Sequence, residues 1–188
     1  MDDQAGSPAD GGDDARERFE ALAAEVVEPV RRFLARRTDR DTADDVLSET
    51  LLVCWRRLDD VPEHALPWVY GVARHCLENA ERGERRQRRL AARITVVDPP
   101  EEAVREVDPP DARVNAALEA LRPEDAELLR LWAWEQLGPS EIAEVLGVTP
   151  NAVSIRLHRA RGKFVDELGK IDSDAGHEGA TEKGGRHE

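Results

Sequence analysis

The 188-residue sequence has few aromatic residues and few cysteines, and each shortage excludes a class of structure. Aromatic residues make up 4% of the chain and charged residues make up 36%. This balance favours solvated helices over a β-sandwich. The two cysteines, Cys54 and Cys76, cannot build a disulfide framework and have no metal-ligand spacing. We therefore expect both cysteines to be small core residues, and we expect no metal and no cofactor.

Long apolar runs are also missing. No stretch approaches the roughly 20 apolar residues that span a bilayer, and the N-terminus lacks the basic and apolar segments of a secretory signal. The sequence therefore predicts a cytoplasmic protein that does not contact a membrane. No nucleophile–base pair, phosphate-binding loop or cluster of metal ligands is visible, so the sequence does not predict an enzyme.

Positive charge is scarce overall, since the formal net charge is −13, which is unusual for a DNA-binding protein. The charge is segregated along the chain, however. Residues 1–15 contain five aspartates and no basic residue, and residues 98–111 contain six carboxylates against Arg105. Residues 82–93 contain six arginines against Glu84. Because salt screens attraction to phosphates beyond about 10 Å, this local basic segment matters more than the total charge.

Helical periodicity predicts a first module over residues 16–92. Apolar residues recur every three or four positions over 19–34, where Pro29 predicts a kink or a break. A second helix is expected over about 42–58, then a loop over 59–67, with Pro67 at the start of the next helix. The core-facing residues expected in that third helix are Trp68, Val72, Ala73, Cys76 and Ala80.

The segment 93–111 has two Pro-Pro pairs and spaced carboxylates, a composition typical of a flexible linker. It separates the first module from a second one over residues 112–169. Residues 1–15 and 170–188 are polar and low in apolar bulk, so we expect disordered tails there.

The second module contains the signature of a helix-turn-helix. Gly147 can end one helix in the left-handed conformation, Thr149 can cap the next helix and Pro150 can take its first position. In such a motif the second helix lies in the major groove with its N-terminal residues against base edges. The outward-facing residues are Asn151, Ala152, Ser154, Ile155, Arg156 and Arg159. The alternative is a helical hairpin with a solvated arginine face.

At these residues the sequence resembles a known family. GVTPNAVSIRLHRAR resembles the recognition segment of region 4 of RNA polymerase sigma factors, and EIAEVLG resembles the helix before it. ADDVLSETLLVCWRRL resembles the region 2 helix that binds the clamp helices of the largest polymerase subunit. PWVYGVARHCLENAERGERRQRR resembles the adjoining segment that melts and reads the −10 element. The order of segments resembles the extracytoplasmic-function (ECF) group over about residues 16–168.

The resemblance implies an all-α protein with two small helical domains, a region 2 bundle and a region 4 helix-turn-helix, joined by a flexible acidic linker. Such a protein binds core RNA polymerase and directs it to promoters without catalytic chemistry of its own. The implied partners are core polymerase and promoter DNA, double-stranded at −35 and melted at −10. The resemblance also allows an anti-sigma factor, although the sequence does not require one.

The resemblance assigns roles to three surfaces. The polymerase-facing residues are Asp45, Ser48, Glu49 and Leu52. The residues facing −10 DNA are Trp68, His75, Asn79, Arg82, Arg85 and Arg86, beside the loop 59–67. The residues facing −35 DNA are Asn151, Ala152, Ser154, Ile155, Arg156 and Arg159. The family usually has Gln where Ser48 stands and commonly Asn where His75 stands, so both contacts differ here. Helical spacing alone favours the core for Trp68, and the arginines could equally form a solvated helix end.

The alternative function is a helix-turn-helix regulator that occupies promoters without joining polymerase. Such a regulator needs neither the polymerase-facing helix with Asp45, Glu49 and Leu52 nor a −10 segment. An exposed leucine on an otherwise polar helix face indicates a partner surface. The sequence therefore favours the sigma factor.

Overall fold

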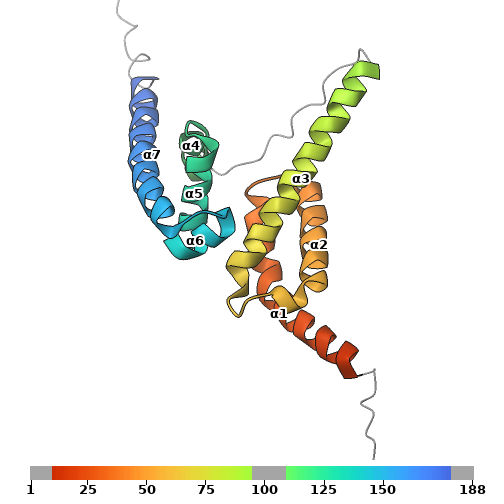
Figure 1. Cartoon of the computed structure of the whole chain (residues 1–188). Helices are drawn as coiled ribbons and strands as arrows, with labels where there is room; N and C mark the ends of the chain where they lie inside the picture. Colours follow the sequence, from red (N-terminus) through yellow and green to blue (C-terminus); the bar gives the residue numbers. More distant parts are fainter. Residues whose placement is uncertain (1–9, 95–108, 179–188) are drawn as a thin grey trace, which may run out of the picture. The chain divides into compact units, whose positions relative to one another are not determined.

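The computed structural model describes residues 10–94 and 109–178, which are helical apart from the turns between helices (Figure 1). Two compact units form: the first contains α1 to α3, and the second contains most of α4 to α7. The prediction of an all-α protein with two small helical domains is therefore confirmed.

Three long helices pack against one another in the first unit (Figure 1). They are α1 (Asp10–Ala35), α2 (Arg40–Arg56) and α3 (Ala65–Ile94), and a short 3-10 helix η1 (Leu58–Asp60) follows α2. The side chains with at most 2% exposure in this core include Val26, Val30, Phe33, Leu34, Val46, Thr50, Cys54, Val69 and Ala73. Complete burial of one large aliphatic side chain contributes about 1.5–3 kcal/mol, so this core holds the three helices together.

The break that Pro29 predicts does not occur, because α1 continues through it as one helix. An internal proline costs about 3 kcal/mol, since it removes one backbone donor and crowds the preceding turn. Val26 and Val30 flank Pro29 and are fully buried, as is Phe33 one turn later. Their burial outweighs the cost of the proline, which sequence periodicity alone could not decide.

The boundaries of both expected tails differ from the predicted ones. Helix α1 begins at Asp10, so residues 10–15 of the expected N-terminal tail are helical. Helix α7 continues to Glu178, because Asp172 pairs with Arg113 of α4 and Ile171 is half-buried. Residues 1–9, 95–108 and 179–188 lie outside the described residues, so these parts of the predicted tails and linker stay predictions.

The buried face of α3 was predicted only in part. Ala73 and Cys76 are buried as expected, and the buried residues that were not predicted are Ala65, Pro67, Val69, Tyr70 and Leu77. The residues that turn out half-buried are Trp68, Val72 and Ala80. The helix begins at Ala65, before Pro67, and Tyr70 stacks on Phe33 of α1 with ring centroids 5.0 Å apart. This contact rotates the inner face toward Tyr70, and no local pattern reveals it.

The second unit consists of α4 (Pro109–Glu119), α5 (Pro123–Ala133), α6 (Pro139–Leu146) and α7 (Pro150–Glu178). Helix α7 packs against both α4 and α5. Lys163 on α7 donates a hydrogen bond from Nζ to Oδ2 of Asp125 on α5 at 2.7 Å. Because Asp125 is 9% exposed, this pair satisfies a carboxylate that burial would otherwise penalise.

The helix-turn-helix geometry is confirmed at each of its three signals. Gly147 has φ 65°, and the next residue, Val148, donates its N–H to the Ala143 carbonyl at 3.0 Å. Thr149 Oγ1 accepts the N–H of Ala152 at 3.3 Å, and Pro150 is the first residue of α7. These contacts end α6 and begin α7 within one short turn.

Candidate polymerase and nucleic-acid interfaces

The outer face of α2 carries Asp45, Ser48, Glu49 and Leu52, all of which are exposed. Leu52 keeps 45% of its surface in solvent, as expected of an apolar residue in a protein-binding surface. The Ser48 hydroxyl donates to the Asp44 carbonyl at 2.9 Å, so it turns toward its own helix. The structure therefore brings the four predicted residues onto one surface, with Leu52 as its apolar member.

An N-terminal cap fixes the start of this helix. Asp39 accepts the Thr42 N–H at 3.0 Å on Oδ1 and the Thr42 hydroxyl at 2.8 Å on Oδ2. These hydrogen bonds favour the charged carboxylate and lower the pKa of Asp39 below its ordinary value. The cap thus orders the first turn of α2, immediately before the residues predicted to face polymerase.

Trp55 belongs to the same surface but was missed in the sequence. It is 44% exposed and lies one turn after Leu52 on α2. The Phe19 ring of α1 meets the Trp55 ring edge-on, with centroids 5.2 Å apart and planes at 80°. The signal was available, because a residue three positions after an outward leucine lies on a neighbouring part of the helix surface.

The two cysteines are confirmed as core residues. Cys54 is 0% exposed and Cys76 is 4% exposed. Burial raises the pKa of the Cys54 thiol to about 11, with a further contribution from Cys76. Burial and the charge of Glu49 also raise the pKa of Cys76, against a hydrogen bond with Thr50. Both thiols therefore stay protonated at neutral pH, which suits a packing role.

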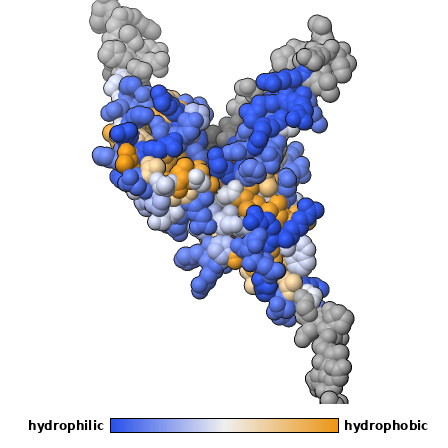
Figure 2. All heavy atoms as spheres, viewed as in Figure 1, coloured by the Kyte–Doolittle hydropathy of each residue, from blue (hydrophilic) through white to orange (hydrophobic). Residues whose placement is uncertain are grey.

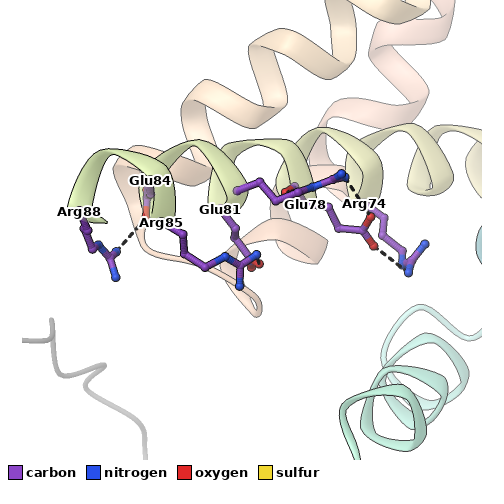
Figure 3. Close-up of polar contacts among 7 residues, drawn as sticks. Arg74, Glu78, Glu81, Glu84, Arg85 and Arg88 are labelled. Atoms are coloured by element: carbon purple, nitrogen blue, oxygen red, sulfur yellow. Dashed lines mark hydrogen bonds and ion pairs between the residues drawn. The ribbon is translucent and has the colours of Figure 1, made fainter. Parts of the chain in front are cut away.

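One side of α3 carries a ladder of ion pairs between residues four positions apart (Figure 3). Arg74 pairs with Glu78 at 2.7 Å, Arg85 with Glu81 at 3.4 Å and Arg88 with Glu84 at 2.9 Å. Arg82 lies 3.7 Å from Glu78 and also donates to the Glu78 carbonyl at 3.0 Å. Some arginines of the 82–93 cluster are therefore paired with glutamates of the same helix.

A second side of α3 carries His75, Asn79, Arg82, Arg86 and Arg89, all exposed. Their spacing of four, three, four and three residues keeps them on one face of the helix. Arg85 belongs to the ladder side instead, although the sequence groups it with Arg82 and Arg86. We call the set from His75 to Arg89 the α3 stripe, and Arg89 is the member that the sequence analysis did not name.

The loop before α3 lies close to Trp68, which is half-buried. The guanidinium carbon of Arg57 lies 5.4 Å from the Trp68 ring centroid, and Arg57 Nε also donates to Asp60 at 3.0 Å. One face of the indole is therefore covered by a cation. The segment predicted as a loop over 59–67 contains the end of η1 and the first residues of α3, which leaves residues 61–64 between helices.

The outer face of α7 begins directly after the turn. Asn151, Ile155 and Arg159 are exposed at four-residue intervals, and Ile155 keeps 47% of its surface in solvent. Ala152 and Arg156 are half-buried at one border of this face. Ser154 is exposed, and its hydroxyl donates to the Pro150 carbonyl at 3.0 Å. The six predicted residues thus lie on the first three turns of α7, and Asn151, Ile155 and Arg159 are at the centre of this face.

Comparison with known proteins decides the family. Residues 111–164 match the family described as "Sigma-70, region 4". The chain is 29% identical over 164 residues to the RNA polymerase sigma factor CarQ of Myxococcus xanthus, covering 85% of this chain and 94% of CarQ. It is 32% identical over 166 residues to the ECF RNA polymerase sigma factor SigL of Mycobacterium tuberculosis, covering 79% of this chain and 89% of SigL. The chain belongs to the ECF RNA polymerase sigma factors.

As a sigma factor, the protein binds core RNA polymerase and directs the initiation of transcription at selected promoters. Sigma factors are initiation factors and not enzymes. The fold agrees with this family. The structure of a sigma factor RpoE in complex with the anti-sigma factor NepR, from Bartonella quintana, covers 82% of this chain and 98% of RpoE with a TM-score of 0.61 and 19% identity. Across residues 10–94 and 109–178, no helix of this sigma factor is both long and apolar enough to cross a bilayer.

Proposed function

We propose that the three surfaces divide the work of the sigma factor. The outer face of α2, with Asp45, Ser48, Glu49 and Leu52, binds core polymerase. The observation that carries this assignment is the exposure of Leu52 and Trp55 on a helix whose opposite face is tightly packed. A regulator that only binds DNA gains nothing from this apolar surface, whereas a subunit that docks on a large enzyme buries it.

The outer face of α3 receives the melted −10 element. His75 and Asn79 supply hydrogen-bonding groups for a base edge, and the arginines supply charge for phosphates. Trp68 offers the ring face opposite Arg57 for stacking, whereas Tyr70 is buried against Phe33. Of the arginines that the sequence assigns here, Arg82 and Arg86 face the same way as His75, and Arg85 contributes to the ladder.

The first turns of α7 read the −35 element in the major groove. The Asn151 amide can hydrogen-bond to the edge of an adenine, and the Ile155 side chain can contact the methyl group of a thymine. Arg159 follows one turn later and suits a base or a phosphate. Ala152 and Ser154 lie beside them, and Arg156 borders the core, so it is better placed for the DNA backbone than for a base.

An anti-sigma factor is a further partner in this proposal. The RpoE structure is that of a sigma factor with such an inhibitor, and the sigma factor fold is shared with this chain. An inhibitor that covered Leu52 and the recognition helix together would block polymerase and DNA at once. The proposed place of action is the cytoplasm, where polymerase and promoters are.

A charge reversal on α2 tests the polymerase assignment. Asp45→Arg combined with Glu49→Arg should abolish binding of the full chain to core polymerase, because it reverses two charges around Leu52. The control is Glu25→Arg, which changes an exposed acid of α1 and leaves α2 untouched. Binding is measured by titration against labelled core polymerase. Unchanged affinity of the double variant would remove the assignment.

Promoter selection is tested with the same components. Core polymerase with the parent chain is given genomic DNA, and the 5′ ends of the transcripts are sequenced, with core polymerase alone as the control. We expect a defined set of start sites that share −10 and −35 elements. If the chain binds DNA but adds no start sites, the alternative of a regulator that acts without polymerase is supported.

A further inference from the structure

The C-terminal part of α3 extends beyond the core of the first unit. From Glu81 to Arg89 every residue is exposed except Glu84, which is half-buried. Figure 2 shows this part of α3 as a continuous hydrophilic surface. A helix segment with so little packing contributes little to the core, so its arginines require another explanation.

The ion-pair ladder divides these arginines into two sets. Arg85 and Arg88 lie 3.4 Å and 2.9 Å from glutamates one turn earlier, so their charges are largely compensated (Figure 3). Arg86 and Arg89 are exposed and make no hydrogen bond or ion pair with another residue of the part of the chain that the structure describes. The helix is therefore nearly neutral on one side and cationic on the other.

The cationic side continues the α3 stripe. Arg86 lies two turns after Asn79, and Arg82 lies between them. At 1.5 Å per residue, Arg82, Arg86 and Arg89 follow one another at about 6 and 4.5 Å along the helix axis. One DNA strand carries a negative charge about every 3.4 Å along the duplex axis. The stripe is therefore opposite in charge to a strand that runs beside the helix, and its spacing is of the same order as that of the phosphates.

We propose that Arg86 and Arg89 bind phosphates of the promoter strand next to the segment held by His75 and Asn79, whereas Arg85 and Arg88 only stabilise the helix. This rests on the proposed function, because it assumes that the outer face of α3 receives −10 DNA. The two free arginines hold the strand in place without reading its sequence. They are positioning residues, and His75 and Asn79 recognise the bases.

The salt dependence of promoter binding tests the division. The test variant is Arg86→Gln with Arg89→Gln, and the control is Arg85→Gln with Arg88→Gln, which removes the same charge from the same helix. Holoenzyme is assembled from core polymerase and each full chain, and its affinity is measured on a promoter fragment that the parent selects. Salt is varied between about 50 and 200 mM, the range over which phosphate contacts have a large effect.

We expect the slope of log affinity against log salt to fall by about 1.4–1.8 in the test variant, the contribution of two phosphates. The advantage of the parent over this variant should then shrink by roughly tenfold across a fourfold rise in salt. The control should keep the slope of the parent to within about 0.5, and both variants should bind core polymerase normally. The same slope for both variants would overturn the inference, whereas a parent holoenzyme that selects no promoter would instead overturn the proposed function.

Discussion

At the scale of single residues, the C-terminal ends of α5 and α6 depend on the left-handed backbone conformation. Gly147, after α6, has φ 65°, and Gln136, after α5, has φ 57°. A residue with a Cβ pays about 1–2 kcal/mol for this conformation, whereas glycine adopts it freely. A Cβ added at Gly147 would meet no atom within 4 Å, so only the backbone conformation favours glycine there.

Exchanging the residue types should therefore have opposite effects at the two positions. Gly147→Ala should lower the stability of the second unit by about 1 kcal/mol, and Gln136→Gly should raise it by about 0.5–1 kcal/mol. Urea unfolding in a Trp55→Phe, Trp68→Phe background, followed by the fluorescence of Trp132 and Trp134, measures both changes. A loss of stability in Gln136→Gly would show that the Gln136 side chain makes a contact worth more than the backbone strain.

At the scale of the helix, α2 is organised by what lies at its start and on its outer face. Asp39 closes the first turn through Thr42, and the residues proposed to bind polymerase begin at Asp45. Since an N-cap hydrogen bond orders the first turn, the proposed docking surface depends on a carboxylate that is not part of it. This link makes α2 sensitive to acid.

The folded-state pKa of Asp39 is lowered from its ordinary value of 3.8. The stability that Asp39 contributes is therefore present above pH 3.8 and is lost as the pH falls from there through the lower folded-state pKa. Asp39→Asn keeps a good cap but does not titrate. The measurement is the hydrogen-exchange protection of the α2 amides in this pH window, expressed relative to protection at pH 6. We expect the variant to lose less of this protection than the parent. Equal losses in both would assign the acid sensitivity to other carboxylates.

The elements that the sequence predicted are those with local chemical signals. Gly147, Thr149 and Pro150 mark the helix-turn-helix because each acts on its own backbone. The burial of Tyr70 was not predictable, because its partner Phe33 lies on another helix. The ladder was predictable but overlooked: Glu81 and Arg85 are four positions apart, and this spacing separates Arg85 from Arg86 on the helix surface.

At the scale of the whole molecule, the second unit extends further toward the C-terminus than its apolar pattern indicates. The last turns of α7 lie beside α4, with Asp172 paired to Arg113 and Ile171 half-buried. Residues 170–188 contain five acidic residues against three basic ones. So small a net charge is well screened at physiological salt, which argues against this segment as a competitor for the basic surfaces.

Two truncations separate structure from regulation. Deleting residues 179–188 should leave thermal unfolding unchanged, whereas deleting 170–188 should destabilise the second unit by about 1 kcal/mol through the lost ion pair and burial. Transcription in vitro with core polymerase should change less than about threefold in both, equivalent to about 0.7 kcal/mol. A tenfold gain on either deletion would make the segment a regulator of the sigma factor.

Helix α3 is one uninterrupted helix from Ala65 to Ile94. The number of residues between its packed and exposed parts therefore sets the direction in which the exposed side chains point relative to the packed ones. One inserted residue after Ala80 would turn Arg86 and Arg89 by about 100° around the axis and leave His75 and Asn79 where they are. Seven inserted residues would restore the direction to within about 20° but move the arginines outward by about 10 Å. The proposed strand contact thus depends on the length of this helix as well as on its composition, since a deletion that preserves every arginine can still turn them away from the side of His75 and Asn79.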